Sequence, residues 1–185
     1  MIDELIQEGE RRMQKAVEVL HEDLLTVRTG RASTSLLDGV QVEYYGSPTP
    51  LNQLASVTVS DARTLLITAY DRAALGNIDK AIRKADLGLN PSSDGTIMRV
   101  IVPSLTEERR REMVKVVHKK LEEHKVAVRN VRREVHDKLK AMEKDKTAAA
   151  DDIRRATERL QKITDHAIAE MDHVGLAKEN DVMAV

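Results

Sequence analysis

The chain has 185 residues, with 30 Lys and Arg against 31 Asp and Glu, so its net charge of −1 predicts no indiscriminate binding to polyanions. It has no Cys, which excludes disulfides, zinc knuckles and thiol chemistry. The acidic start does not resemble a signal peptide, and no apolar run approaches the roughly 20 residues that cross a bilayer. We therefore expect a cytoplasmic protein that does not contact membranes.

Aromatic residues are scarce and confined to one part of the chain. There is no Trp or Phe, and the three tyrosines are Tyr44, Tyr45 and Tyr70. Platforms that stack unpaired bases depend on exposed aromatic rings, so this composition argues against such a platform. The core must be largely aliphatic.

The first 29 residues predict one amphipathic helix, because apolar side chains recur every three or four positions and the pattern stops at Thr29-Gly30. This stripe consists of Ile2, Ile6, Met13, Val17, Leu20, Leu24 and Val27.

Residues 40–102 show a different sequence pattern, in which runs of strand-forming residues are separated by turn residues. Within this segment, residues 73–88 predict an amphipathic helix that Gly88 ends, and Asn90–Gly95 reads as a turn cluster before the last strand. A helix between strands indicates a small α/β domain, β-rich and sandwich-like.

From Ser104 the chain predicts helices again, with either Ser104 or Thr106 as the first cap. About 40 residues without Gly or Pro follow, and after the loop at residues 144–152 a further helix is expected. The two apolar stripes are Met113, Val117, Leu121, His124, Val128, Val131, Val135, Leu139 and Met142, and then Ile153, Ala156, Leu160, Ile163, Ala167, Met171 and Val174.

Three stripes with a spacing near 3.5 residues predict an antiparallel three-helix bundle. The fold class is then α+β with two domains: a bundle from residues 1–30 and 104–185, and an inserted domain at 31–103. The chain passes between them twice, so we expect hinges near 29–31 and 102–105, at Thr29, Gly30, Pro103 and Ser104. The alternative is that these residues only end their elements and the domains are fixed.

Charge is segregated along the chain. Residues 105–146 carry a net charge of +5, whereas residues 1–30 and 147–185 each carry −3. Helical spacing places one row of basic side chains in a single sector of the long helix: Arg111, Lys115, His118, Lys125, Arg129, Arg133, His136 and Lys140. This basic ridge can bind phosphates of folded RNA, or it can be an ordinary solvated face.

No constellation for catalysis is evident. The six histidines show no metal-ligand spacing, no phosphate-binding glycine motif occurs, and His124 lies on an apolar stripe where packing is the expected role. We therefore predict a binding or mechanical protein that is not an enzyme and holds no metal or cofactor. A cytosolic scaffold for another protein is the alternative function.

Several long strings are similar to the bacterial ribosome recycling factor family over almost the whole chain: RTGRAS, VEYYGSPTPLNQLASVTV, DLGLNP, LTEERRR and VAVRNVRREVHDKLK. This resemblance implies an L-shaped molecule of tRNA-like outline with a flexible hinge. It also implies an activity, in which the factor binds the post-termination ribosome and, with elongation factor G and GTP, separates the subunits and releases the mRNA. GTP belongs to the partner.

The resemblance further implies which surface meets the ribosome. The bundle would lie on large-subunit ribosomal RNA and the RNA that bridges the subunits, while elongation factor G pushes the inserted domain, and we expect a monomer. The RNA-facing residues would be Arg28, Arg31, Arg109, Arg110, Arg129, Arg132 and Arg133, with Arg132 ranked first, and the basic ridge adds Arg111, Lys115, Lys125 and Lys140.

The end of the chain departs from this pattern. Gly175 falls inside the expected third helix and weakens it by about 1 kcal/mol relative to Ala. We therefore expect fraying from about residue 175.

Overall fold

The computed structural model describes residues 1–184, which form two compact units. The first comprises Met1–Val27 and Val114–Asn180, and the second comprises Arg28–Met113 with the chain from Asp181 onward. Contacts within the chain thus divide it after Val27, after Met113 and after Asn180. No helix in the described part is long and apolar enough to span a bilayer.

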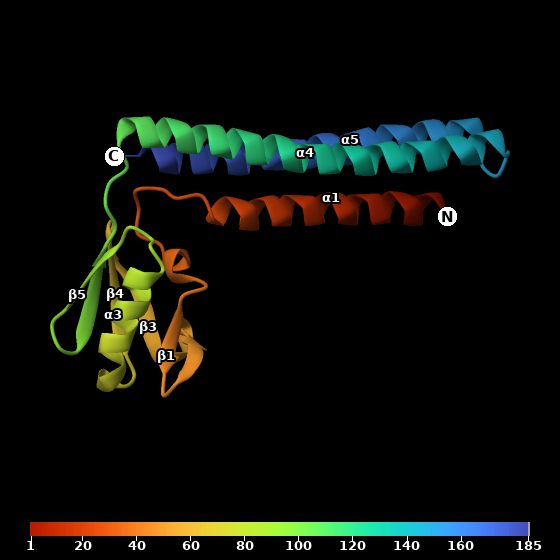
Figure 1. The fold of residues 1–185 in the computed structure, drawn as a ribbon. Helices are drawn as coiled ribbons and strands as arrows, with labels where there is room; N and C mark the ends of the chain where they lie inside the picture. Colours follow the sequence, from red (N-terminus) through yellow and green to blue (C-terminus); the bar gives the residue numbers. More distant parts are fainter. Residues whose placement is uncertain (185) are drawn as a thin grey trace. The chain divides into compact units, whose positions relative to one another are not determined.

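The first unit is a bundle of the long helix α1 (Ile2–Leu25) with most of α4 (Glu107–Lys144) and most of α5 (Ala150–Met183) (Figure 1). Contacts between charged side chains show how these helices run relative to one another. Arg12 of α1 contacts Glu134 of α4 at 2.6 Å, and Asp23 contacts Lys120 at 2.7 Å, so α1 and α4 are antiparallel. Lys125 of α4 contacts Asp172 of α5 and His118 contacts Glu179, so these two helices are antiparallel as well. The predicted three-helix bundle is confirmed.

Two glycines allow the helices to approach closely. A Cβ built on Gly9 of α1 would lie 3.0 Å from Cγ2 of Val135, and one on Gly175 of α5 would lie 2.9 Å from Cδ2 of Leu121. Gly175 is therefore a packing position, at which the missing side chain makes room for Leu121. The predicted fraying from residue 175 is wrong, because α5 continues to Met183 and Val182 is fully buried.

Thr106 caps α4. Its Oγ1 accepts a hydrogen bond from the backbone N–H of Arg109 at 3.1 Å, and Glu107 and Glu108 put negative charge at the positive end of the helix dipole. The other candidate, Ser104, is instead bonded to the guanidinium of Arg63.

The second unit contains two antiparallel sheets. One is the hairpin β1–β2, and the other has the order β3-β4-β6-β5. The strands are β1 (Gln41–Tyr44), β2 (Ser47–Pro50), β3 (Ala55–Asp61), β4 (Thr64–Ala69), β5 (Asn90–Ser93) and β6 (Ile97–Ile101); the short helices are η1 (Thr34–Leu37), α2 (Leu51–Leu54), η2 (Arg72–Ala74) and α3 (Leu75–Lys84).

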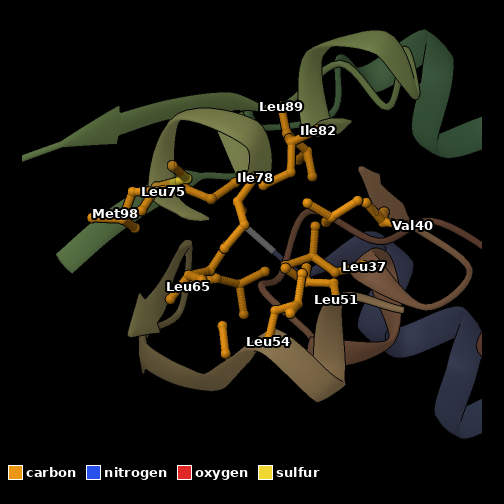
Figure 2. Close-up of a cluster of buried hydrophobic side chains, with 14 of the residues drawn as sticks. Leu37, Val40, Leu51, Leu54, Leu65, Leu75, Ile78, Ile82, Leu89 and Met98 are labelled. Carbon is orange, nitrogen blue, oxygen red and sulfur yellow. The ribbon is translucent and has the colours of Figure 1, made fainter. Parts of the chain in front are cut away.

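The core of this unit is aliphatic, as its composition predicts. Leu65 of β4 and Met98 of β6 belong to one buried cluster with Leu75, Ile78 and Ile82 of α3, and Met98 lies beside Leu75 in it (Figure 2). Burying each such side chain contributes about 1.5–3 kcal/mol, so this cluster holds α3 against one face of the sheet.

Two segments of this unit differ from what their sequence predicts. The helix predicted at 73–88 is shorter, since α3 ends at Lys84, and Asp86 (φ +52°) and Gly88 (φ +70°) turn the chain away. The predicted turn at Asn90–Gly95 begins with strand β5, which pairs with β6. Because β5 is the edge of its sheet, Pro91 interrupts no ladder on its outer side.

Candidate nucleic-acid interface

The predicted RNA-facing arginines divide between the two units. Arg129, Arg132 and Arg133 belong to the bundle, whereas Arg28, Arg31, Arg109 and Arg110 belong to the second unit. Three of the seven predicted arginines thus lie in the first unit and four in the second.

The bundle group lies in the middle of α4. Arg129 and Arg133 are exposed, and Arg132 is half-buried beside the buried Val131 and Val135 of the apolar stripe. Within residues 1–184, Arg132 and Arg133 form no ion pair, and the nearest carboxylate to Arg129 is that of Glu122, at 3.8 Å. Guanidinium groups without an internal partner can pair with phosphate oxygens without first breaking a salt bridge.

Lys125 does not lie on an exposed ridge. Its side chain is only 11% exposed, and its Nζ lies 2.5 Å from Asp172 of α5 and 3.6 Å from Glu122. His136 is half-buried too, and its Nδ1 has no partner among the described residues. The prediction of a continuous exposed ridge is therefore wrong at these two positions, because helical angle alone does not reveal that Asp172 of α5 pairs with Lys125.

The remaining members of the basic ridge are exposed, and most have an acidic neighbour. Arg111 contacts Glu107 at 2.6 Å, Lys140 contacts Glu143 at 3.5 Å, and His118 contacts Glu179 at 3.2 Å. Exposed ion pairs of this kind contribute about 0–1 kcal/mol, so they can open at little cost when a phosphate competes. Lys115 is exposed and forms no ion pair in the described part of the chain.

The arginines of the second unit are more constrained. A Cβ on Gly88 would lie 3.2 Å from Nη1 of Arg28, so the Arg28 guanidinium packs against the backbone there. Arg31 lies 3.6 Å from Asp181 and Arg109 lies 2.6 Å from Glu112, while Arg110 is half-buried and without an ion pair among residues 1–184.

Arg63 was missed by the sequence interpretation. Together with Arg31 and Arg110 it lines a cavity of about 400 Å³ that also includes Ser104. These residues come from three separate parts of the chain, and nothing in the turn around Arg63 signals that it joins the other two arginines. The pairing of β3 with β4 positions Arg63, together with a hydrogen bond from the Val102 N–H to the Arg63 carbonyl and the bond from its guanidinium to Ser104.

Asp23, Lys120 and His124 form a polar cluster between α1 and α4. The Lys120 Nζ donates to Asp23 Oδ1 at 2.7 Å, and the His124 Nε2 lies 2.9 Å from Asp23 Oδ2. The bond from Lys120, and then that from His124, lowers the pKa of Asp23. His124 is 18% exposed and packs as predicted. No group of three His, Cys, Asp or Glu within residues 1–184 could hold a metal ion.

The four predicted hinge residues all lie within the second unit. Thr29 Oγ1 accepts a bond from the Arg31 N–H at 3.2 Å, and Ser104 contacts Arg63. A Cβ on Gly30 would have Leu105 N as its nearest neighbour, at 3.8 Å, so no tight packing requires glycine there. Bending at these positions stays a prediction.

Comparisons with known proteins agree with one another. The sequence model of the family described as "Ribosome recycling factor" matches residues 20–183. Over the full length of both chains, the sequence is 52% identical to the ribosome-recycling factor of Bacillus pumilus and 50% identical to that of Legionella pneumophila.

Two solved structures are similar over the whole chain. One is a solution structure of a ribosome recycling factor, with a TM-score of 0.76 and 43% identity, of which 98% is covered. The other is a Thermus thermophilus ribosome recycling factor, with a TM-score of 0.68, 46% identity and all of that chain covered. It belongs to models in which that factor and Escherichia coli elongation factor G are bound to the E. coli post-termination complex.

Proposed function

Because this chain belongs to the ribosome recycling factor family, we propose that it contacts ribosomal RNA through the arginines in the middle of α4. Its function is that of the family: it acts with elongation factor G on the post-termination complex. It is a translation factor and not an enzyme. The RNA contacts belong to large-subunit RNA and to the RNA that bridges the subunits, and the place of action is the cytoplasm.

The observation that carries this proposal is the state of Arg132 and Arg133. Both are cationic, neither has an ion pair among the described residues, and both project from a helix of 38 residues. Such a helix is about 57 Å long. Arginines held along one helix can contact phosphates of a folded RNA without reading its bases.

The inserted unit receives the action of elongation factor G in this proposal, and GTP is hydrolysed by that partner. The chain itself works as a monomer and supplies binding and mechanical coupling, with Thr29, Gly30, Pro103 and Ser104 as the hinge. Cys residues introduced at the exposed Ser47 and Glu158 would be the only thiols. Labels on them should report a broad or ligand-dependent distance, and one narrow, invariant distance would remove the hinge from the proposal.

The decisive experiment is the splitting of purified post-termination ribosomes, followed by light scattering. Scattering should fall only when this protein, elongation factor G and GTP are all present. Arg132→Ala should weaken ribosome binding and change the free energy of unfolding by less than about 1 kcal/mol. Arg154→Ala on α5, where Arg154 is 66% exposed, is the matched control and should bind normally. Equal affinities of the two variants would exclude Arg132 from the interface.

The scaffold alternative makes a different prediction. It requires a saturable protein partner and no association with ribosomes, so sedimentation with ribosomes in the same preparation distinguishes the two functions.

A further inference from the structure

We propose that the β1–β2 turn forms a notch that binds an arginine or lysine side chain presented by a basic protein partner. The notch has a volume of about 360 Å³ and is lined by Glu43, Tyr44, Tyr45, Gly46, Ala73 and Asn77. It lies in the second unit and shares no residue with the arginine groups described above, so it is a separate contact from the RNA interface.

The conformation of Tyr45 is unusual for an aromatic residue. β1 and β2 are joined by the two-residue turn Tyr45-Gly46, in which φ is +49° and +76°. Positive φ at both positions is typical of a type I′ turn, whose first position favours Asn, Asp or Gly. The Tyr45 side chain is also 84% exposed, so burial in the fold does not compensate for the strained backbone. A strained and exposed aromatic residue points to a use outside the fold.

The neighbouring ring is held in place from two sides. The Tyr44 hydroxyl donates to Asp71 Oδ2 at 3.0 Å, and its ring meets that of Tyr45 edge-on, with centroids 4.5 Å apart and an interplanar angle of 72°. Asp71 Oδ1 also accepts from the N–H of Ala73, another lining residue. This network fixes the walls of the notch before a ligand arrives, which reduces the entropy lost on binding.

The charge of the notch selects a cation. Glu43 is exposed and forms no ion pair in the described part of the chain, the Asp71 carboxylate accepts the hydrogen bond of the Tyr44 hydroxyl, and none of the lining residues is basic. A lining that combines an acidic residue with two tyrosines suits a guanidinium or ammonium group, because such a cation can pair with a carboxylate and contact the face of an aromatic ring. The same carboxylate repels phosphate, so the notch favours a basic protein segment over RNA. Exposed tyrosines are also frequent anchors of protein interfaces.

The test uses the free, full-length chain and a short peptide, acetyl-Gly-Arg-Gly-Arg-Gly-amide, with its neutral citrulline analogue as the matched ligand at constant ionic strength. We would follow the NMR amide signals of Gly46 and Asn77 during titration. The arginine peptide should shift these signals at least threefold more than the citrulline peptide. Glu43→Gln should abolish the difference, whereas Glu10→Gln, which removes an exposed carboxylate of α1, should leave it intact.

Tyr45→Asn supplies a second arm. Because Asn suits the first position of a type I′ turn, this variant should keep or raise the melting temperature, yet its arginine-dependent shift should fall at least twofold. Equal shifts with the two peptides, or an unchanged difference in Glu43→Gln, would overturn the proposal. Ribosomes are absent from this test, so its failure leaves the recycling function untouched, and a failed recycling assay leaves the notch untouched.

Discussion

The Nζ of Lys125 in α4 lies 2.5 Å from the Oδ1 of Asp172 in α5, so one cation of the basic ridge is satisfied inside the bundle. Arg133, two turns further along the same helix, is exposed and has no such partner among residues 1–184. Two residues that a helical projection places in one row therefore differ in their availability to phosphate.

This difference predicts distinct salt dependences of ribosome binding. In a plot of log affinity against log salt, Arg133→Gln should reduce the magnitude of the slope by about 0.7–0.9, because one phosphate contact is lost. Lys125→Gln should leave the slope unchanged within error. The measurement is ribosome binding of both variants from low to high salt. A reduced slope for Lys125→Gln would show that Lys125 contacts a phosphate after all.

The cluster at Asp23 predicts a pH-dependent contribution to stability. The pKa of Asp23 is lowered in the folded state by Lys120 and then His124, so the stabilisation is present above the unfolded pKa of about 3.9 and is lost as the pH falls through the folded value. Asp23→Asn should cost about 1–2 kcal/mol at pH 7, a value between those of exposed and buried pairs.

The measurement is urea unfolding of the wild type and Asp23→Asn between pH 7 and pH 3. Their difference in free energy should shrink below about pH 4. Glu22→Gln changes the exposed neighbouring residue, which has no ion pair among the described residues, and should behave as wild type at every pH. A difference that stays constant down to pH 3 would mean that the Asp23 charge does not cause it.

Gly175 predicts a dependence of bundle stability on side-chain size. Ala at this position gains about 1 kcal/mol of helix propensity, and the Leu121 methyl that a Cβ would meet at 2.9 Å ends a flexible side chain that can shift. Gly175→Ala should therefore be close to neutral, whereas Gly175→Leu should cost about 1–3 kcal/mol by overpacking. Thermal unfolding distinguishes them, and a Leu variant as stable as the Ala variant would contradict the packing role.

Gly88 and Arg28 predict an energetic coupling. Gly88→Ala places a Cβ in a backbone of φ +70° and 3.2 Å from the Arg28 guanidinium, so it should cost about 1–2 kcal/mol of stability. In the background of Arg28→Ala the backbone strain remains but the contact is gone, so the cost should be smaller. A double-mutant cycle by urea unfolding measures the coupling, and purely additive effects would show that Arg28 does not limit residue 88.

The elements that could be predicted from the sequence are those with a long periodic signal. The apolar stripe from Ile6 to Leu24 and the corresponding stripes in α4 and α5 predicted the bundle. In each helix, apolar residues recur on the same face at every turn, and that face is buried. Strand β5 could not be predicted in this way, since Asn90–Ser93 has low strand propensity and becomes a strand only by pairing with β6.

The sequence could indicate which basic residues of the candidate site lie on α4, but not which of them pair with other parts of the chain. Arg129 and Arg133 followed from charge segregation and the resemblance, whereas Arg132 followed from the resemblance alone. The sequence could not indicate that Asp172, 47 residues after Lys125, neutralises that lysine, nor that Arg63 lies with Arg31 and Arg110. Both facts depend on contacts between distant segments, which periodicity within one element does not report.

The contacts of α1 with α4 and α5 also determine the order in which the chain can fold as it is synthesised. The hydrogen bonds of α1 reach across 97 residues to Lys120, 122 to Glu134 and 156 to Arg159. When α1 has left the exit tunnel, none of these partners yet exists, whereas the sheet of the second unit forms from a continuous stretch. The inserted unit can therefore fold first. The apolar face of α1 stays exposed to solvent during this time, so α1 of the nascent chain should bind chaperones until α4 has emerged.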